Sequence, residues 1–268
     1  MERFSLAVTD GATVARRNII KITRMPELLV AVVIMPLVFV LLFAYVFGSD
    51  IDIEGGSYRE FLIGGAFAMM LTFGSTFTGL GLADDMQKGI IDRFRSLPMS
   101  RSAVVLGRTA SDVIYNVLSM IVMVAAGYAV GWRINNGIGD AALGFALVLL
   151  FAYAFSWIMA YVGLTVGSVE AINNASSLVI FPLTFIANTF VPVDDFPAPL
   201  RVFAEWNPVS TVAHAARERF GNIPEGAPEP TAWPLENATL YTLGWVVIIL
   251  AVFAPLAVRK YQHAAAGA

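Results

Sequence analysis

Long runs of apolar residues recur along the chain, and each is close to the length that crosses a lipid bilayer. A hydrocarbon core of about 30 Å needs about 20 apolar residues in a helix. The first run begins too far into the sequence, and is too long, for a cleaved signal peptide, so we expect it to be a retained span. The pattern predicts an all-α membrane protein with six transmembrane helices, at about 28–47, 61–82, 103–130, 141–166, 175–190 and 239–258.

Charged residues concentrate between the second and third of these spans, in the stretch 83–112. Within it, residues 87–97 have a helical period that separates an apolar face from a charged face, and Pro98 ends the pattern. Lys88 and Asp92 are four residues apart, close enough to pair. Such a helix either docks against a partner or lies on lipid headgroups, and the spacing leaves both open. The faces are Ile90, Ile91, Phe94 and Leu97 on one side and Lys88, Asp92 and Arg95 on the other.

Two further segments have amphipathic patterns outside the spans. Residues 11–25 predict a basic helix that lies in the membrane interface. Residues 199–220 predict two short helices separated at Asn207-Pro208, with Pro199 suited to a helix start and Gly221 to a helix end. We expect this pair to be external and re-entrant, to dip into the outer leaflet and to close the outer end of a transport path. The alternative is a surface hairpin that rests on the spans. Candidate outer-gate residues are Leu200, Phe203, Trp206 and Val212.

The composition agrees with a membrane location and removes several classes of function. Of the 268 residues, 57% are hydrophobic and only 14% are charged, against about 25% charged in soluble domains. A net charge of −3 gives no reason to expect a nucleic-acid partner. The chain has no cysteine and two histidines, which argues against a metal site of these residues. It has no GxxxxGK[ST], HExxH or GxSxG motif, so we expect neither ATP hydrolysis nor other catalysis by this chain.

The distribution of lysine and arginine predicts the orientation. With six spans and an internal N-terminus, twelve basic residues fall in cytoplasmic segments and five in external ones. The positive-inside rule therefore places both termini and the stretch 83–112 in the cytoplasm. The twelve are Arg3, Arg16, Arg17, Lys21, Arg24, Lys88, Arg93, Arg95, Arg101, Arg108, Arg259 and Lys260, and the five are Arg59, Arg133, Arg201, Arg217 and Arg219.

Few polar residues in the spans suggest chemistry. Arg108 and Asp112 are one helical turn apart, so we expect them to pair with each other rather than to conduct protons. Two small-xxx-small pairs predict tight helix packing. Separately, Asn174-Ala-Ser176 matches the glycosylation pattern, but this signal is weak. Candidate path residues are Met70, Phe73 and Phe77 in the second span and Phe181, Phe185, Asn188 and Thr189 in the fifth. The aromatic and methionine side chains among them suit a hydrophobic cargo. The glycine pairs are Gly127 with Gly131 and Gly163 with Gly167.

The order of parts resembles the ABC-2 family of transporter permeases, and within it the daunorubicin-resistance-type exporter permeases of actinobacteria. Two segments carry the resemblance, KGIIDRFRSLPMSR at 88–101 and FPLTFIANTFVPVDDFPAPLRVFAEWNPVSTV at 181–212. The resemblance covers the whole chain, but its motifs say little about the cargo.

The resemblance implies a permease in the bacterial plasma membrane, in which two copies pair and each docks on a separate cytosolic ABC ATPase. ATP and Mg²⁺ would bind to that ATPase, and no cofactor to this chain. The helix at 11–25 would be the connecting helix, which lies in the membrane interface. Spans two and five would line the path for a hydrophobic drug or lipid. The helix at 87–97 would couple to the ATPase, with Arg93 and Arg95 able to pair with acidic groups beside its groove. The coupling residues would be Gln87, Lys88, Ile90, Ile91, Asp92, Arg93, Phe94, Arg95 and Leu97.

Other functions remain to be compared with this one. An ABC-2 permease could also export a lipid-linked glycan or polysaccharide. An autonomous secondary transporter is a different class, but it would need mid-membrane carboxylates or inverted repeats, which the sequence does not have. A membrane enzyme could hold Mg²⁺ on Asp84 and Asp85, but no further spaced aspartates support it.

Overall fold

The computed structural model describes residues 30–47, 57–91, 103–193, 196–223, 226 and 229–263. Within these ranges every regular element is a helix, and none is a strand. The expected all-α fold is therefore confirmed. The predicted interfacial helix at 11–25 and residues 92–97 of the predicted coupling helix lie outside the described ranges.

Four long apolar helices form the body of the molecule. By length and composition each can cross a membrane, at Tyr58–Gln87, Val104–Ala129, Ile138–Val166 and Ala238–Gln262. The first of these is interrupted once, so it consists of α4 (Tyr58–Gly74) and α5 (Thr76–Gln87). The others are α7 (Ala103–Ala129), α8 (Ile138–Val166) and α13 (Ala238–His263).

Two shorter apolar segments occupy the first and fifth predicted spans. The first consists of η1 (Val30–Ile34), α3 (Met35–Leu42) and η2 (Phe43–Phe47), with Pro36 in the first turn of α3, where its missing N–H is tolerated. The second is α9 (Val169–Phe185), which contains Pro182. The structure places this helix earlier than the predicted 175–190, because Ser168 caps its N-terminus by accepting a hydrogen bond from the backbone N–H of Ala171.

Segment 199–220 contains two helices, followed by a third short one. These are α10 (Ala198–Trp206), α11 (Pro208–Phe220) and α12 (Trp233–Glu236). Asn207 separates the first two, and its side chain accepts a hydrogen bond from the N–H of Val209 at 2.9 Å. Gly221 ends α11 in the left-handed conformation, with a φ of 70°. Asn207 as an N-cap and Gly221 as a C-cap are the residues from which the sequence predicted the limits of α11.

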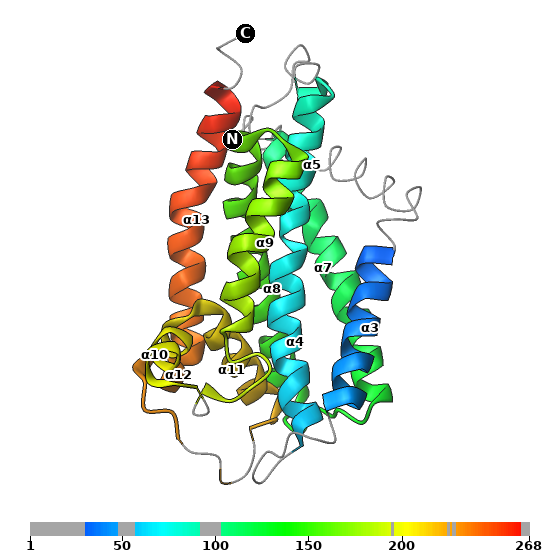
Figure 1. Cartoon of the computed structure of the whole chain (residues 1–268), viewed down its shortest axis with the longest axis vertical. Helices are drawn as coiled ribbons and strands as arrows, with labels where there is room; N and C mark the ends of the chain where they lie inside the picture. The colour runs from blue at the N-terminus through cyan, green and yellow to red at the C-terminus, as the bar shows by residue number, and fades with distance from the viewer. Residues whose placement is uncertain are drawn as a thin grey trace.

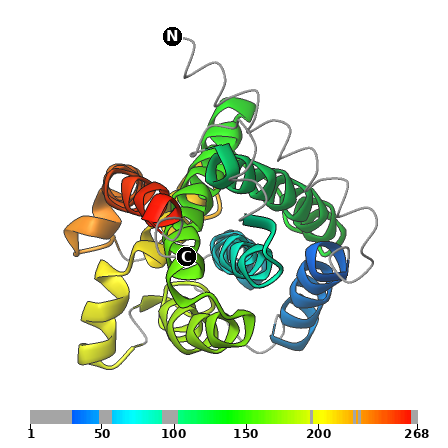
Figure 2. The ribbon, with the colours of Figure 1, turned by 90° about the horizontal axis from the view of Figure 1, so that it is seen from above.

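Helix α8 lies at the centre and packs against α4, α5, α7, α9, α11 and α13. Figure 1 shows that α10, α11 and α12 gather at one end of the bundle, whereas α5 and α13 terminate at the other. We call these the α11 end and the α5 end. Seen from above, α4 lies between α9 on one side and α3 and α7 on the other (Figure 2). The two ends of the bundle thus present different elements to their surroundings.

The break between α4 and α5 has a side-chain cause. Ser75 donates its hydroxyl to the carbonyl of Ala152 on α8 at 2.8 Å and lies 3.1 Å from that of Leu71 in its own helix. Thr72 donates to the carbonyl of Ala68 at 2.6 Å. Hydroxyls that bond the preceding turn bend helices. The break therefore falls midway along this helix and is fixed to α8.

The predicted glycine pairs divide into packing and terminating residues. Gly163 on α8 packs against Gly79 on α5, and a Cβ at Gly163 would lie 2.5 Å from the Gly79 carbonyl oxygen. Gly167, by contrast, ends α8 with a φ of 63°. Likewise Gly127 packs against Trp132, whereas Gly131 has a φ of 101° in the turn after α7. Only the first glycine of each pair packs closely, because the second ends its helix.

Candidate functional site

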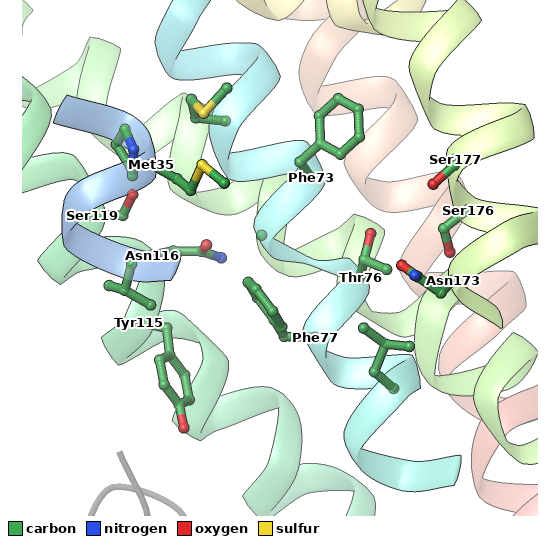
Figure 3. A pocket seen from close by; sticks show the side chains of 15 residues that line it. Met35, Phe73, Thr76, Phe77, Tyr115, Asn116, Ser119, Asn173, Ser176 and Ser177 are labelled. Carbon is green, nitrogen blue, oxygen red and sulfur yellow. The ribbon is translucent and has the colours of Figure 1, made fainter. Parts of the chain in front are cut away.

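A cavity of about 350 Å³ lies between the helices, next to the break in the long helix α4–α5. Its walls come from η1, α3, α4, α5, α7 and α9, and Figure 3 shows the side chains that surround it. One part of the wall is apolar and aromatic, with Met35, Met70, Phe73, Phe77 and Leu80. The other part is polar, with Thr76, Tyr115, Asn116, Ser119, Asn173, Ser176 and Ser177.

The structure brings three of the seven predicted path residues to this cavity. Met70, Phe73 and Phe77 line it from α4 and α5. Phe181 and Phe185, in contrast, stack on each other with centroids 4.0 Å apart and are partly exposed on the outside of α9. They do not line the cavity, because the face of α9 that does so carries Asn173, Ser176 and Ser177.

The remaining two predicted path residues lie in the turn after α9, where they hold α11. The backbone N–H of Asn188 donates to the Ser210 hydroxyl at 2.9 Å. The carbonyl of Thr189 accepts from the Arg217 guanidinium at 3.1 Å. Both side chains are buried in protein. Their inclusion followed from a predicted span to 190, whereas α9 ends at Phe185.

Sequence reasoning missed the polar wall of the cavity. The run Asn173 to Ser177 reads NNASS inside an apolar segment, and Asn116 and Ser119 lie three residues apart on α7. Polar side chains at such positions are a default signal of function in membrane proteins. The signal was present, but the first run was interpreted only as a weak glycosylation pattern.

A buried ion pair lies beside the cavity, toward the α5 end. Nε of Arg108 is 3.7 Å from Oδ2 of Asp112, so the predicted pairing is confirmed. Arg108 also donates to the carbonyl of Phe77 at 2.7 Å, and the Thr78 hydroxyl donates to Asp112. Gly81 leaves room for this guanidinium, since a Cβ there would overlap it. The pair therefore joins α7 to α5 and does not line the cavity.

Arg217 on α11 fixes the opposite end of the bundle. Its side chain is fully buried, with Nε donating to the carbonyl of Phe61 at 2.7 Å and Nη2 to that of Thr189 at 3.1 Å. The guanidinium also lies 3.6 Å from the Phe61 ring centroid, a cation–π contact. The sequence analysis counted Arg217 among external charges. The structure shows that its side chain is buried and joins α11 to α4 and to the turn after α9.

The four predicted outer-gate residues fall into two environments. Leu200, Phe203 and Trp206 lie on α10 and are 43%, 49% and 54% exposed. Val212 on α11 is fully buried, since α11 packs on α4, α8 and α13. The apolar stripe of α11 is thus part of the protein core, whereas that of α10 faces outward.

Aromatic side chains surround Tyr241 at the α11 end. The rings of Trp206, Trp233 and Trp245 lie 6.3, 6.0 and 6.3 Å from it, and the Tyr241 hydroxyl donates to the Trp206 carbonyl at 3.0 Å. Such rings are typical of a membrane–water interface.

The described part of the predicted coupling helix is not one continuous helix. Gln87 ends α5, and Gly89 has a φ of 65°. Lys88 pairs with Asp84 at 2.8 Å, and this hydrogen bond raises the pKa of Lys88. Ile91 is only 3% exposed and packs in a cluster that includes Val105 and Tyr261. Ile91 therefore belongs to the bundle, whereas Gln87 is exposed at the end of α5. Ile90 is half-buried, and the pairing of Lys88 with Asp92 lies outside the described residues.

Long apolar helices, a cavity between them whose described lining residues carry no charge, and different elements at the two ends fit the class of multi-pass membrane transport proteins. Comparison with protein families agrees: residues 11–220 match the ABC-2 type transporter model. The chain therefore belongs to the ABC-2 transporter permease family, whose members are membrane subunits of transporters. The resemblance inferred from segments 88–101 and 181–212 is confirmed.

Individual relatives agree with this assignment. The chain is 29% identical to the daunorubicin resistance ABC transporter permease protein DrrB1 of Streptomyces coeruleorubidus, over 98% of this chain and 90% of that protein. It is 24% identical to the probable doxorubicin resistance ABC transporter permease protein DrrC of Mycobacterium tuberculosis, over 69% of this chain and 63% of that protein. The putative transport permease ycf38 of Pyropia yezoensis is 24% identical, over 77% and 72%.

Proposed function

We propose that the chain is the membrane subunit of an ATP-driven exporter of hydrophobic or amphiphilic compounds, powered by a separate cytosolic ABC ATPase. The observation that carries this proposal is the cavity of about 350 Å³ between apolar helices, whose lining residues within the described ranges are all uncharged. Its volume falls in the range of small-molecule sites. Membership of the ABC-2 family and the names of the drug-resistance relatives support the same class.

The proposed assembly has two permeases and two ATPases. In each permease six helical segments cross the membrane, with α3 and α9 as the two shorter spans. Both termini and the α5 end face the cytoplasm, and the α11 end faces outward. The positive-inside count supports this orientation. The aromatic cluster around Tyr241 supports only the placement of the α11 end at a membrane–water interface. A cytoplasmic α5 end presents the segment after Gln87 to the ATPase.

We expect the purified chain alone to hydrolyse no ATP and to bind its ATPase through the segment that follows α5. Phe94→Asp should abolish most of this binding, because a new carboxylate would have to be desolvated in an apolar groove. The measurement is recovery of the ATPase with affinity-purified permease, together with ATP-dependent uptake into inverted vesicles.

A matched control introduces the same charge elsewhere at the α5 end. Ala171 is exposed in the first turn of α9, where a carboxylate is tolerated by the helix dipole. Ala171→Asp should retain the ATPase. Normal recovery of the ATPase with Phe94→Asp would contradict the coupling role of the segment after α5. ATP turnover by the permease alone would contradict the assignment of ATP hydrolysis to a separate subunit.

We expect α10 to lie against the outer leaflet, so that its exposed apolar face is shielded by lipid. Because the chain has no cysteine, single cysteines at Leu200 and Phe203 can be compared with one at exposed Glu229. A membrane-impermeant thiol reagent should label Glu229→Cys rapidly and the other two slowly. Equal rates at the three positions would make α10 a solvated surface helix. Val212 is unsuitable for this test, since protein buries it.

Export of a lipid-linked glycan is the second candidate. It would require a path for a large hydrated head group, whereas the described cavity is small and partly apolar. An autonomous secondary transporter has no support from the family assignment. The cavity therefore favours a compact hydrophobic or amphiphilic cargo.

A further inference from the structure

Two hydroxyl groups in the cavity wall have no hydrogen-bond partner among the residues that the structure describes. Thr76 on α5 and Ser176 on α9 are 8% and 7% exposed, and Oγ1 of Thr76 and Oγ of Ser176 make no hydrogen bond. Most buried hydroxyls in proteins form hydrogen bonds, and a buried hydroxyl without one costs about 1–3 kcal/mol of stability. Both residues line the same cavity from different helices, so a polar group of a ligand is a candidate partner for their hydroxyls.

The polar groups stand on both sides of an aromatic centre. Figure 3 shows Thr76 and Ser176 close together on one side, Asn116 and Ser119 on the other, and Phe77 between them. Figure 2 agrees, since α4 lies between α7 and α9. A ligand that fills this space would have an apolar middle against the phenylalanine rings and a hydrogen-bonding group toward each end.

A small residue brings the second polar group close to the long helix. Gly74 has no side chain, and a Cβ there would lie 2.6 Å from Oδ1 of Asn116. The Asn116 amide thus occupies the space beside Gly74 at the edge of the cavity, directly before the break at Ser75. Any larger residue at position 74 would displace the amide.

Among the residues that the structure describes, the cavity wall carries no charge, which restricts the ligand further. None of the fifteen described lining residues is aspartate, glutamate, lysine or arginine. The neighbouring Arg108 and Asp112 are paired with each other. A charged ligand would lose its hydration without gaining a counterion, which is costly in a low-dielectric site.

We propose that this cavity binds an uncharged amphiphile, with a rigid apolar body and a hydroxyl or carbonyl group near each end. Thr76 and Ser176 bind one end, Asn116 and Ser119 bind the other, and Phe73 and Phe77 pack on the body. The inference deepens the proposed export function by naming the cargo class, and it rests on that function only for the consequence of binding.

The test uses purified permease in nanodiscs, without ATPase, and a single cysteine at Met70 as a reporter in the cavity wall. Estradiol is the probe, because it is uncharged, rigid and has a hydroxyl at each end. Tetraphenylphosphonium is the charged comparison. Estradiol should slow alkylation of Met70→Cys by N-ethylmaleimide several-fold, and tetraphenylphosphonium should not. A cysteine at Leu178, which is 77% exposed on α9 and outside the cavity, should be alkylated at the same rate with or without estradiol.

Hydroxyl deletions then test the proposed contacts in the Met70→Cys background. Thr76→Val and Ser176→Ala should each raise the estradiol concentration for half-protection by about two- to tenfold, the range for one neutral hydrogen bond. Thr109→Val and Ser156→Ala are matched controls. These hydroxyls are buried, bond only backbone carbonyls of their own helices and lie outside the cavity.

Each result decides the proposal. Protection by estradiol that weakens in the two cavity variants, and not in the controls, supports it. No protection by estradiol, equal protection by tetraphenylphosphonium, or equal weakening in cavity and control variants overturns it. Because the assay needs neither ATP nor transport, it can fail while ATP-driven export is intact, and it can succeed where export fails.

Discussion

Replacing Arg217 with methionine should destabilise the protein more than any other single arginine substitution in its described part. The guanidinium is fully buried and holds the carbonyls of Phe61 and Thr189. Methionine fills much of the space but leaves both carbonyls without this donor, which should cost about 3 kcal/mol. The measurement is the midpoint of thermal unfolding in detergent, followed by the loss of the monodisperse peak in gel filtration.

Two further variants separate the geometry of Arg217 from its charge. Arg217→Lys keeps the charge but replaces a planar fork by one ammonium, so it should recover only part of the stability. Arg219→Ala on the same helix removes an arginine whose side chain is 35% exposed and which pairs with Asp140 at 3.2 Å. It should change stability by less than about 1 kcal/mol. Equal midpoints for the Arg217 and Arg219 variants would mean that the buried contacts do not hold α11.

Gly163→Val should separate α5 from α8 and strongly reduce the folded yield. A Cβ at Gly163 would lie 2.5 Å from the Gly79 carbonyl oxygen and 2.8 Å from its Cα, both backbone atoms that cannot rotate away. The smaller change Gly163→Ala should still cost about 1–3 kcal/mol through overpacking. Thermal unfolding of the alanine variant gives a number even where the valine variant does not accumulate.

The control for helix propensity is Gly244→Ala in α13. Gly244 is exposed, and a Cβ there would meet no atom within 4 Å. Alanine is the better helix former by about 1 kcal/mol, so this variant should be as stable as the parent or more stable. If both alanine variants raised the unfolding midpoint, the close crossing of α5 and α8 would not be a tight contact.

The sequence predicted the helices well wherever their own residues define them. Apolar length indicated the long spans, and Asn207-Pro208 with Gly221 marked the limits of α11. It failed where a helix end depends on a distant contact or a local cap. Ser168 starts α9 early, and the turn after Phe185 is held by Ser210 and Arg217 from α11, neither of which periodicity can show.

The cavity was predictable only in part, for a physical reason. An aromatic face on the second span was recognisable from its helical period, so Met70, Phe73 and Phe77 were found. The polar wall combines α7 with α9, and only the tertiary structure shows that these segments face one cavity. A helix pattern identifies which residues share a face, but not which face meets another helix. The sequence therefore shows that Asn116 and the run from Asn173 to Ser177 are polar, but it does not show that they line the same cavity.

The aromatic cluster at the α11 end provides an intrinsic fluorescence signal for this part of the protein. Three of the five tryptophans, Trp206, Trp233 and Trp245, lie around Tyr241. The other two, Trp132 and Trp157, are buried in the bundle. Emission from partly exposed indoles responds to the polarity around them, whereas buried ones contribute a steady background. Intrinsic fluorescence can therefore report whether α10 keeps its place against α13 when partner or cargo is added, without any attached dye.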